Sequence, residues 1–254
     1  KETAPNGSTN IYTYDANGMP KTVARTVSSQ ETFTKYFTYD NFGNVIETTD
    51  SNGTKINSTF DASGNPLTIS VRESANVVNT STYTYDSFNR LLSSKTPKDE
   101  LTKYGYSSTG KLAKITDPNN QVTKYTFDLF DRVATITNPK NQTISYDYDS
   151  DGNLIQITDA KGRTSNYSYD GKGRLTRSVY VDDEILYSYN INDAVTKVEN
   201  KNSRIIYGYD AAGRINSQSI VGKNSLADYP NISQIFTFNA DGSRIAFTDN
   251  RGTD

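Results

Sequence analysis

The chain has 254 residues and a formal net charge of -2, with 33% hydrophobic and 22% charged residues. Its charges are spread evenly, which excludes a basic field for nucleic acid, and no apolar run reaches the ~18 residues of a membrane span. Cys and His are absent, which removes disulfides, thiolate nucleophiles, the commonest general base and the commonest metal ligand. We therefore expect no nucleic-acid partner, no membrane insertion and no cofactor. The low apolar content suits an extended sheet better than a thick core.

One pattern of seven residues recurs along the whole chain. Two aromatic residues flank a small polar residue, with Ser58 as the one exception, an anchor residue follows, and Gly, Asn or Asp stands three positions later. The eleven copies are "YTYDANG" (12–18), "FTYDNFG" (37–43), "STFDASG" (58–64), "YTYDSFN" (83–89), "YGYSSTG" (104–110), "YTFDLFD" (125–131), "YDYDSDG" (146–152), "YSYDGKG" (167–173), "YSYNIND" (187–193), "YGYDAAG" (207–213) and "FTFNADG" (236–242). The period is about 21 residues, and the spacing of two places both aromatic side chains on one face of a strand.

The anchor and the position three residues later predict a turn. The anchor is Asp in eight copies, Asn in two and Ser107 in one, and these side chains accept hydrogen bonds from turn amides. The later position is Gly in eight copies and Asn89, Asp131 or Asp193 in the others. These are the residue types that tolerate a positive φ. Each copy therefore predicts a type I turn that leads into a bulge.

A second turn follows each predicted strand pair. Apolar residues stand after the first turn, and a second turn motif closes the repeat at "DSNG" (50–53), "DPNN" (117–120), "NPKN" (138–141), "DAKG" (159–162) and "DNRG" (249–252). Each repeat thus reads as strand, turn, strand, turn, which gives roughly twenty or more strands. The fold class is all-β, a repetitive sheet of antiparallel β-hairpins. We expect a single array over 1–254, with irregular insertions near 70–80 and 221–233.

The two ends of the sequence also follow the repeat. Residues 4–9 align with the second turn at 117–122, and the last residues follow the second turn at 249–252. Both ends therefore cut through a repeat. We expect the chain to be an excised part of a longer protein.

Two groups of carboxylates are candidate functional sites. "DYDSDG" (147–152) resembles the start of a calcium loop, with Asp147, Asp149 and Asp151 at alternate positions. The twelfth position of that loop requires Glu and here is Thr158, so a hairpin turn is the preferred interpretation. "VDDE" (181–184) offers three adjacent carboxylates to an enzyme, but a solvated loop is preferred. We therefore predict no catalytic, cofactor-binding or metal-ligating residues.

"YTYDANG", "YSYDGKGRL" and "YGYDAAGRI" resemble the tyrosine–aspartate (YD) repeats of the Rhs family. That family includes wall-associated polymorphic toxins, the C component of Tc toxins and teneurins. The resemblance implies a strip of hairpins that curves and spirals into a hollow shell. In bacterial members the shell resembles a container for a C-terminal toxin domain, and in teneurins a similar barrel serves cell adhesion. The self-cleavage motif of toxin-bearing members, Asp-Pro-x-Gly, has its nearest match at 117–120 with Asn in place of Gly. We therefore expect no protease role for these residues.

The repeat and the resemblance lead to one functional expectation and one alternative. We expect a non-catalytic segment of the shell of a secreted or cell-surface protein, which encloses and helps to deliver a C-terminal toxin domain in interbacterial competition. Its partners are the remainder of the shell and the toxin domain. The lack of Cys fits a Gram-positive bacterium, with the protein secreted or in the cell wall. The alternative is a carbohydrate-binding or adhesion module for cell-wall glycan, in which exposed Tyr side chains stack on sugars.

The aromatic columns also predict how the strip is stabilised. Each Tyr or Phe is expected to meet a like ring on the next repeat, at roughly 0.2–1 kcal/mol per cross-strand pair. Such contacts between neighbouring repeats imply that stability is cooperative along the array.

Overall fold

A computed structural model describes residues 1–3, 8–28, 31–74, 77–223 and 232–249. All of its regular elements are β-strands, and these residues contain no helix that is long and apolar enough to cross a membrane. The strands are β1 (Glu2–Thr3), β2 (Thr9–Tyr14), β3 (Pro20–Ser28), β4 (Glu31–Tyr39), β5 (Val45–Asp50), β6 (Lys55–Phe60), β7 (Pro66–Ser74), β8 (Val77–Tyr85), β9 (Leu91–Lys95), β10 (Leu101–Tyr106), β11 (Leu112–Thr116), β12 (Val122–Phe127), β13 (Val133–Thr137), β14 (Thr143–Tyr148), β15 (Leu154–Thr158), β16 (Thr164–Tyr169), β17 (Leu175–Val179), β18 (Glu184–Tyr189), β19 (Val195–Glu199), β20 (Ser203–Tyr209), β21 (Ile215–Gly222), β22 (Ile232–Phe238) and β23 (Arg244–Asp249).

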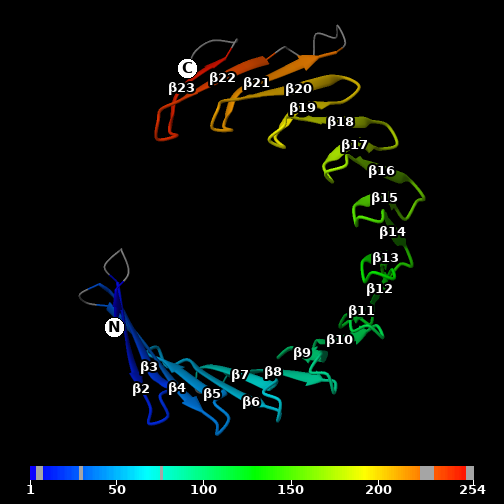
Figure 1. Ribbon diagram of the computed structural model, residues 1–254. Helices are drawn as coiled ribbons and strands as arrows, with labels where there is room; N and C mark the ends of the chain where they lie inside the picture. The colour runs from blue at the N-terminus through cyan, green and yellow to red at the C-terminus, as the bar shows by residue number, and fades with distance from the viewer. Residues whose placement is uncertain (4–7, 29–30, 75–76, 224–231, 250–254) are drawn as a thin grey trace. The chain divides into compact units, whose positions relative to one another are not determined.

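The chain divides into two compact units, residues 1–125 and 126–254. In the first unit, each strand from β1 to β11 pairs antiparallel with its successor. In the second unit, the same pairing runs from β13 to β23. Figure 1 shows the hairpins side by side in chain order within each unit. The predicted all-β strip of antiparallel hairpins is confirmed.

The pairing register gives the strip two different faces. Directly paired residues share a face, so Tyr146 lies beside Ile157 on what we call the aromatic face. The residue between the two aromatic positions points to the opposite, polar face. There the hydroxyls of Thr126 and Thr135 are 2.6 Å apart across a hairpin. Equivalent hydroxyl pairs join Thr13 to Thr22, Thr59 to Thr68 and Thr84 to Ser93 at 2.6–2.7 Å.

The strip is a single layer without a closed core. Among the described residues, no hydrophobic side chain is fully buried, and the accessible surface of the chain is 17047 Å². A compact protein of the same mass, 28.2 kDa, would expose about 11,000 Å². Apolar side chains at some turn tips are almost fully exposed, including Phe42 (85%), Leu129 (101%) and Ile191 (92%). Backbone ladders and half-buried side chains therefore hold each unit together.

The predicted first turns are confirmed in all eleven copies. In the copy at 146–152, the Asp149 amide donates to the carbonyl of Asn153 at 3.0 Å, and the Gly152 amide donates back to the Asp149 carbonyl at 3.2 Å. The φ angle three residues after the anchor is positive in every copy, at 75–91° for the glycines. The three substitutes, Asn89, Asp131 and Asp193, have φ of 61–64°.

The second turns are more varied than the sequence indicates. The turns at 50–53, 117–120, 138–141 and 159–162 each end on a residue with positive φ, as predicted. A further turn of this kind lies at 96–99 and places Asp99 at φ 66°. Two-residue turns occur where Tyr180 donates its amide to the Asp183 carbonyl and Asn200 donates to Ser203. These shorter turns account for the repeats of 20 residues. The predicted turns at 4–9 and 249–252 lie largely outside the described residues.

The extra residues near 70–80, where an irregular insertion is expected, lie mainly in paired strands, with a shift of register between Arg72 and Ser74. Strands β7 and β8 have nine residues each and stay paired as far as Ser74 and Val77, so this repeat is a longer hairpin. Strands β3 and β4 lengthen another repeat in the same way. Of the insertion near 221–233, residues 224–231 lie outside the described residues.

Candidate functional sites on the two margins of the strip

The first turns form one margin of each unit. Where the anchor is Asp, its carboxylate accepts hydrogen bonds from amides of the same turn. In the repeat of Asp170, one carboxylate oxygen accepts the amides of Lys172 and Arg174 at 2.9 and 3.1 Å. The other oxygen accepts Nε of Arg174 at 2.7 Å and lies 2.6 Å from its Nη2. The Arg174 guanidinium lowers the pKa of Asp170 to about 2. The turn therefore holds a permanent ion pair at neutral pH.

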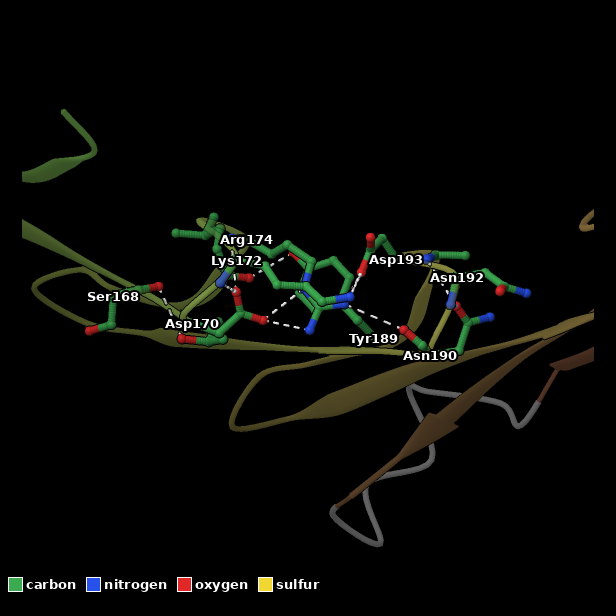
Figure 2. A network of polar contacts seen from close by, with 11 residues as sticks. Ser168, Asp170, Lys172, Arg174, Tyr189, Asn190, Asn192 and Asp193 are labelled. Carbon is green, nitrogen blue, oxygen red and sulfur yellow. Dashed lines mark hydrogen bonds and ion pairs between the residues drawn. The ribbon is translucent and has the colours of Figure 1, made fainter. Parts of the chain in front are cut away.

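The same arginine contacts the next repeat. Figure 2 shows Arg174 lying between Asp170 and Asp193. Its guanidinium carbon lies 4.6 Å from the centre of the Tyr189 ring, and its Nη1 lies 2.5 Å from a carboxylate oxygen of Asp193. Lys172 also pairs with Asp193 at 2.9 Å. A cation above a partly desolvated tyrosine ring contributes more than an exposed ion pair, so this contact fixes the spacing of adjacent repeats.

We call this arrangement the arginine latch: an Arg four residues after the anchor, bound to the anchor Asp and placed over the second aromatic ring of the next repeat. The other latches are Arg90 over Tyr106 at 4.5 Å, Arg132 over Tyr148 at 4.5 Å and Arg214 over Phe238 at 4.7 Å. From residue 86 onward the latch occurs in every second repeat. Asn153 and Ala194 stand at the equivalent position in two intervening repeats.

The hydroxyl of the second aromatic residue makes another bond between repeats. It donates to the backbone carbonyl that lies five residues after the anchor of the preceding repeat. These bonds are Tyr39 to Pro20, Tyr106 to Leu91, Tyr148 to Val133, Tyr169 to Leu154, Tyr189 to Leu175 and Tyr209 to Val195, at 2.7–3.0 Å. Tyr at this position therefore has a specific role that Phe cannot perform.

The prediction that like rings stack between repeats is wrong for the described residues. Their two ring pairs are Tyr167 with Tyr180, at 6.4 Å, and Phe236 with Phe247, at 5.6 Å, and each pair lies within one repeat. Equivalent rings of neighbouring hairpins are separated by two strand spacings, about 9.6 Å. Ring pairs need 4.5–7 Å between centroids. The guanidinium groups of the latches occupy part of this gap.

The three aspartates of "DYDSDG" do not converge. Asp149 is the anchor, and its Oδ1 accepts the amides of Asp151 and Asn153 at 3.0 and 2.8 Å. Asp147 lies within β14 opposite Gln156, on the polar face. The described residues contain no group of three or more side chains placed to hold a metal ion. The hairpin interpretation of this motif is confirmed.

The carboxylates of "VDDE" separate into two places on the second-turn margin. Asp182 and Asp183 line an open cavity of about 330 Å³, together with Tyr180 and other residues of two adjacent second turns. Glu184 instead forms an ion pair with Arg177. At other positions of the described chain, every Asp or Glu with a shifted pKa has it lowered and is ionised at neutral pH.

Comparison with known proteins gives a family and a fold. The family model described as the teneurin YD-shell matches residues 50–230. Solved structures with a similar fold include a TcdB2–TccC3–Cdc42 complex, at 15% identity and a TM-score of 0.55, covering 94% of this chain and 17% of that chain. The Tc holotoxin pore of Photorhabdus luminescens is also similar, at 12% identity and a TM-score of 0.52, covering 94% and 16%. The chain thus spans about a sixth of their length. No curated protein matches the sequence.

Proposed function

The chain belongs to the teneurin YD-shell family, and on that premise we propose that it is a non-catalytic segment of the wall of a larger shell. The observation that carries the proposal is the single-layer strip, in which no described hydrophobic side chain is fully buried. Such a strip has an aromatic face that other parts of a larger protein can cover. Arginine latches and tyrosine hydroxyls hold neighbouring hairpins at fixed spacing, as a wall requires.

The proposal extends to the role of the whole protein. We propose a secreted or cell-surface protein of a Gram-positive bacterium, whose shell encloses a C-terminal toxin domain and helps to deliver it to competing bacteria. The partners of this chain are then the rest of its own shell and the toxin domain. The fold it shares with chains of Tc toxin assemblies supports this extension.

Electron microscopy of the full-length gene product tests the wall proposal. We expect a hollow particle with the hairpins of this chain side by side in its wall. An open ribbon with solvent on both faces would overturn the proposal.

Protease protection tests the enclosure of a toxin domain. In the full-length protein, the C-terminal domain should resist protease until the shell is opened. Replacing the latch residues Arg132, Arg174 and Arg214 with Met should loosen the wall and speed cleavage of that domain. Arg163→Met is the matched control, because Arg163 bonds Asp159 within its own turn. Rapid cleavage of that domain in the unsubstituted protein would contradict enclosure, and equal cleavage in both variants would contradict the role of the latches in holding the wall.

Cell fractionation and co-culture test the proposed localisation and the delivery of a toxin to competing bacteria. The protein should appear in the extracellular or wall fraction, and a strain lacking the gene should lose its advantage over a sensitive competitor. A strictly intracellular protein would overturn the delivery role while leaving the wall proposal intact.

A further inference from the structure

A cavity on the second-turn margin of the second unit is lined by an aromatic residue that packs against a neighbouring ring and remains partly exposed to solvent. It lies between the turns at 159–162 and 180–183. Tyr180 is 40% exposed, and its ring packs edge-on against Tyr167, with 6.4 Å between the ring centres and an interplanar angle of 86°. This packing fixes the orientation of the ring and leaves part of it free for a ligand.

The cavity also carries more carboxylates than cations. Arg163 is its single lining cation, and Nη2 of this residue lies 2.6 Å from the Asp159 carboxylate. Asp183 uses Oδ1 to accept the amide of Glu184 at 2.9 Å. Nearby, Lys201 donates to the backbone carbonyl of Asp182 at 2.6 Å rather than to its carboxylate. Asp159, Asp182, Asp183 and Arg163 line the cavity and Lys201 lies beside it, which leaves a net negative charge, so its field attracts a cation.

The latches show how this chain holds a guanidinium. In each, an aromatic ring lies 4.5–4.7 Å from the guanidinium carbon, and in the latch of Arg132 a carboxylate oxygen lies 2.7 Å from Nε. The cavity is lined by the same two kinds of residue, Tyr180 with Asp182 and Asp183. Its own arginine is already bonded to Asp159. We propose that this cavity binds an arginine side chain of a polypeptide partner.

Chemistry favours arginine over other ligands of this size. A guanidinium is planar, offers five donors and stacks on aromatic rings, so it satisfies a ring and two carboxylates at once. Thr164 and Ser165 also line the cavity. A neutral sugar would stack on Tyr180 but would leave the surplus negative charge unbalanced. The proposal is independent of the role of the strip as a shell wall.

An NMR titration of the complete chain with N-acetyl-arginine amide tests the proposal. We expect the backbone amide signals of Val181, Asp182 and Asp183 to shift and to saturate in the range of ~1–10 mM ligand. N-acetyl-citrulline amide, which has nearly the same shape and no charge, should bind at least roughly fivefold more weakly. The arginine response should weaken as salt is added. Equal binding of the citrulline compound, or a response to methyl glucoside alone, would overturn the proposal.

Matched variants locate the site. Asp182→Asn with Asp183→Asn removes the charge but keeps the side-chain oxygen that accepts the Glu184 amide, so the turn is retained. We expect arginine binding to fall roughly fivefold or more. Asp151→Asn, at an exposed first-turn tip, is the control and should bind as the wild type does. Tyr180→Phe should retain binding, and Tyr180→Leu should lose it. Undiminished binding by the double Asn variant would refute the assignment even if Tyr180→Leu fails to fold.

Discussion

The first-turn margin keeps one turn geometry in every repeat, whereas the second-turn margin combines four-residue turns, two-residue turns and long hairpins. The difference follows from what each turn contacts. A first turn with a latch bonds the next repeat, as Arg174 does at Tyr189 and Asp193. The second turn of Asp159 and Arg163 bonds mainly within itself. Repeats without a latch still receive a tyrosine hydroxyl bond just after the first turn, as Leu154 does from Tyr169. Bonds to a neighbouring repeat are therefore more regular along the margin whose turns keep one geometry.

The largest expected effect comes from removing the carboxylate of the Asp that begins a turn, on each margin in turn. Asp170 and Asp159 both accept two turn amides and an arginine, but only Asp170 holds an arginine placed over the next repeat. Asp170→Ala should lower the melting temperature, followed by circular dichroism, by roughly 4–8 °C. Asp159→Ala should lower it by about half as much. Equal shifts in melting temperature would show that the contacts of Arg174 with the next repeat contribute nothing to stability.

Arginine substitutions test the latch more directly. Arg174→Met should lower the melting temperature by roughly 2–4 °C, because it removes the contact with Tyr189 and the ion pair with Asp193. Arg163→Met should change it by less than about 1 °C, because an exposed ion pair within one turn contributes little. A larger change for Arg163→Met than for Arg174→Met would show that the second-turn arginine contributes more to stability than the latch arginine.

A hydroxyl deletion isolates the second bond between repeats. Tyr169→Phe removes the donor to the Leu154 carbonyl at 2.9 Å, in an interface that has Asn153 in place of a latch arginine. We expect a loss of about 1 kcal/mol in the free energy of unfolding, measured with urea. Tyr146→Phe, at the first aromatic position, is the matched control and should change the free energy much less. Similar losses in both variants would contradict a special role for the second position.

A gain of stability is expected where a latch is missing. Ala194 occupies the latch position after the neutral anchor Asn190, and a Cβ placed on the facing Gly213 would meet no atom within 4 Å. There is thus room for a longer side chain. Asn190→Asp with Ala194→Arg should supply the ion pair and place a guanidinium over Tyr209. The melting temperature should rise by roughly 1–2 °C, and a decrease would show that the interface is set by other contacts.

Acid should weaken the latch in a defined pH interval. The pKa of Asp170 is lowered from 3.8 to about 2 in the folded chain, chiefly by hydrogen bonding from Arg174. A lowered folded-state pKa contributes stability above pH 3.8 that is lost as the pH falls toward 2. The melting temperature of the wild type should therefore decline over this interval, and that of Arg174→Met should decline less. Parallel curves would contradict the ion pair.

The local part of the fold could be predicted from sequence. A turn depends on the side chains within it, so Asp131 and Asp193 signalled a positive φ without any knowledge of their neighbours. The alternation of aromatic and small polar residues likewise predicted the two faces. The shortening of the second turns at 180–183 and 200–203 was not predicted, although the repeat length of 20 residues signalled it.

The contacts between repeats could not be predicted in the same way. Arg174 meets Tyr189 because the register of β17, β18 and their bulge brings them together, and sequence spacing alone does not give that register. The recurrence of Arg four residues after every second anchor was the available signal. The prediction that rings stack between repeats was wrong because each hairpin has two strands. Equivalent rings of neighbouring hairpins therefore lie two strand spacings apart. The sequence predicted a solvated loop at Asp182 and Asp183. It did not predict the cavity beside them, because that cavity forms from two turns about 20 residues apart.

The lack of fully buried apolar side chains among the described residues has a calorimetric consequence. Heat capacity rises on unfolding chiefly because apolar surface becomes hydrated. A single layer already has much of that surface in water, with 17047 Å² accessible in the folded chain. Its heat-capacity increment per residue should therefore fall below the usual ~12–15 cal/mol/K. The isolated chain would then keep a nearly constant margin of stability over a wide range of temperatures, with cold denaturation displaced far below freezing.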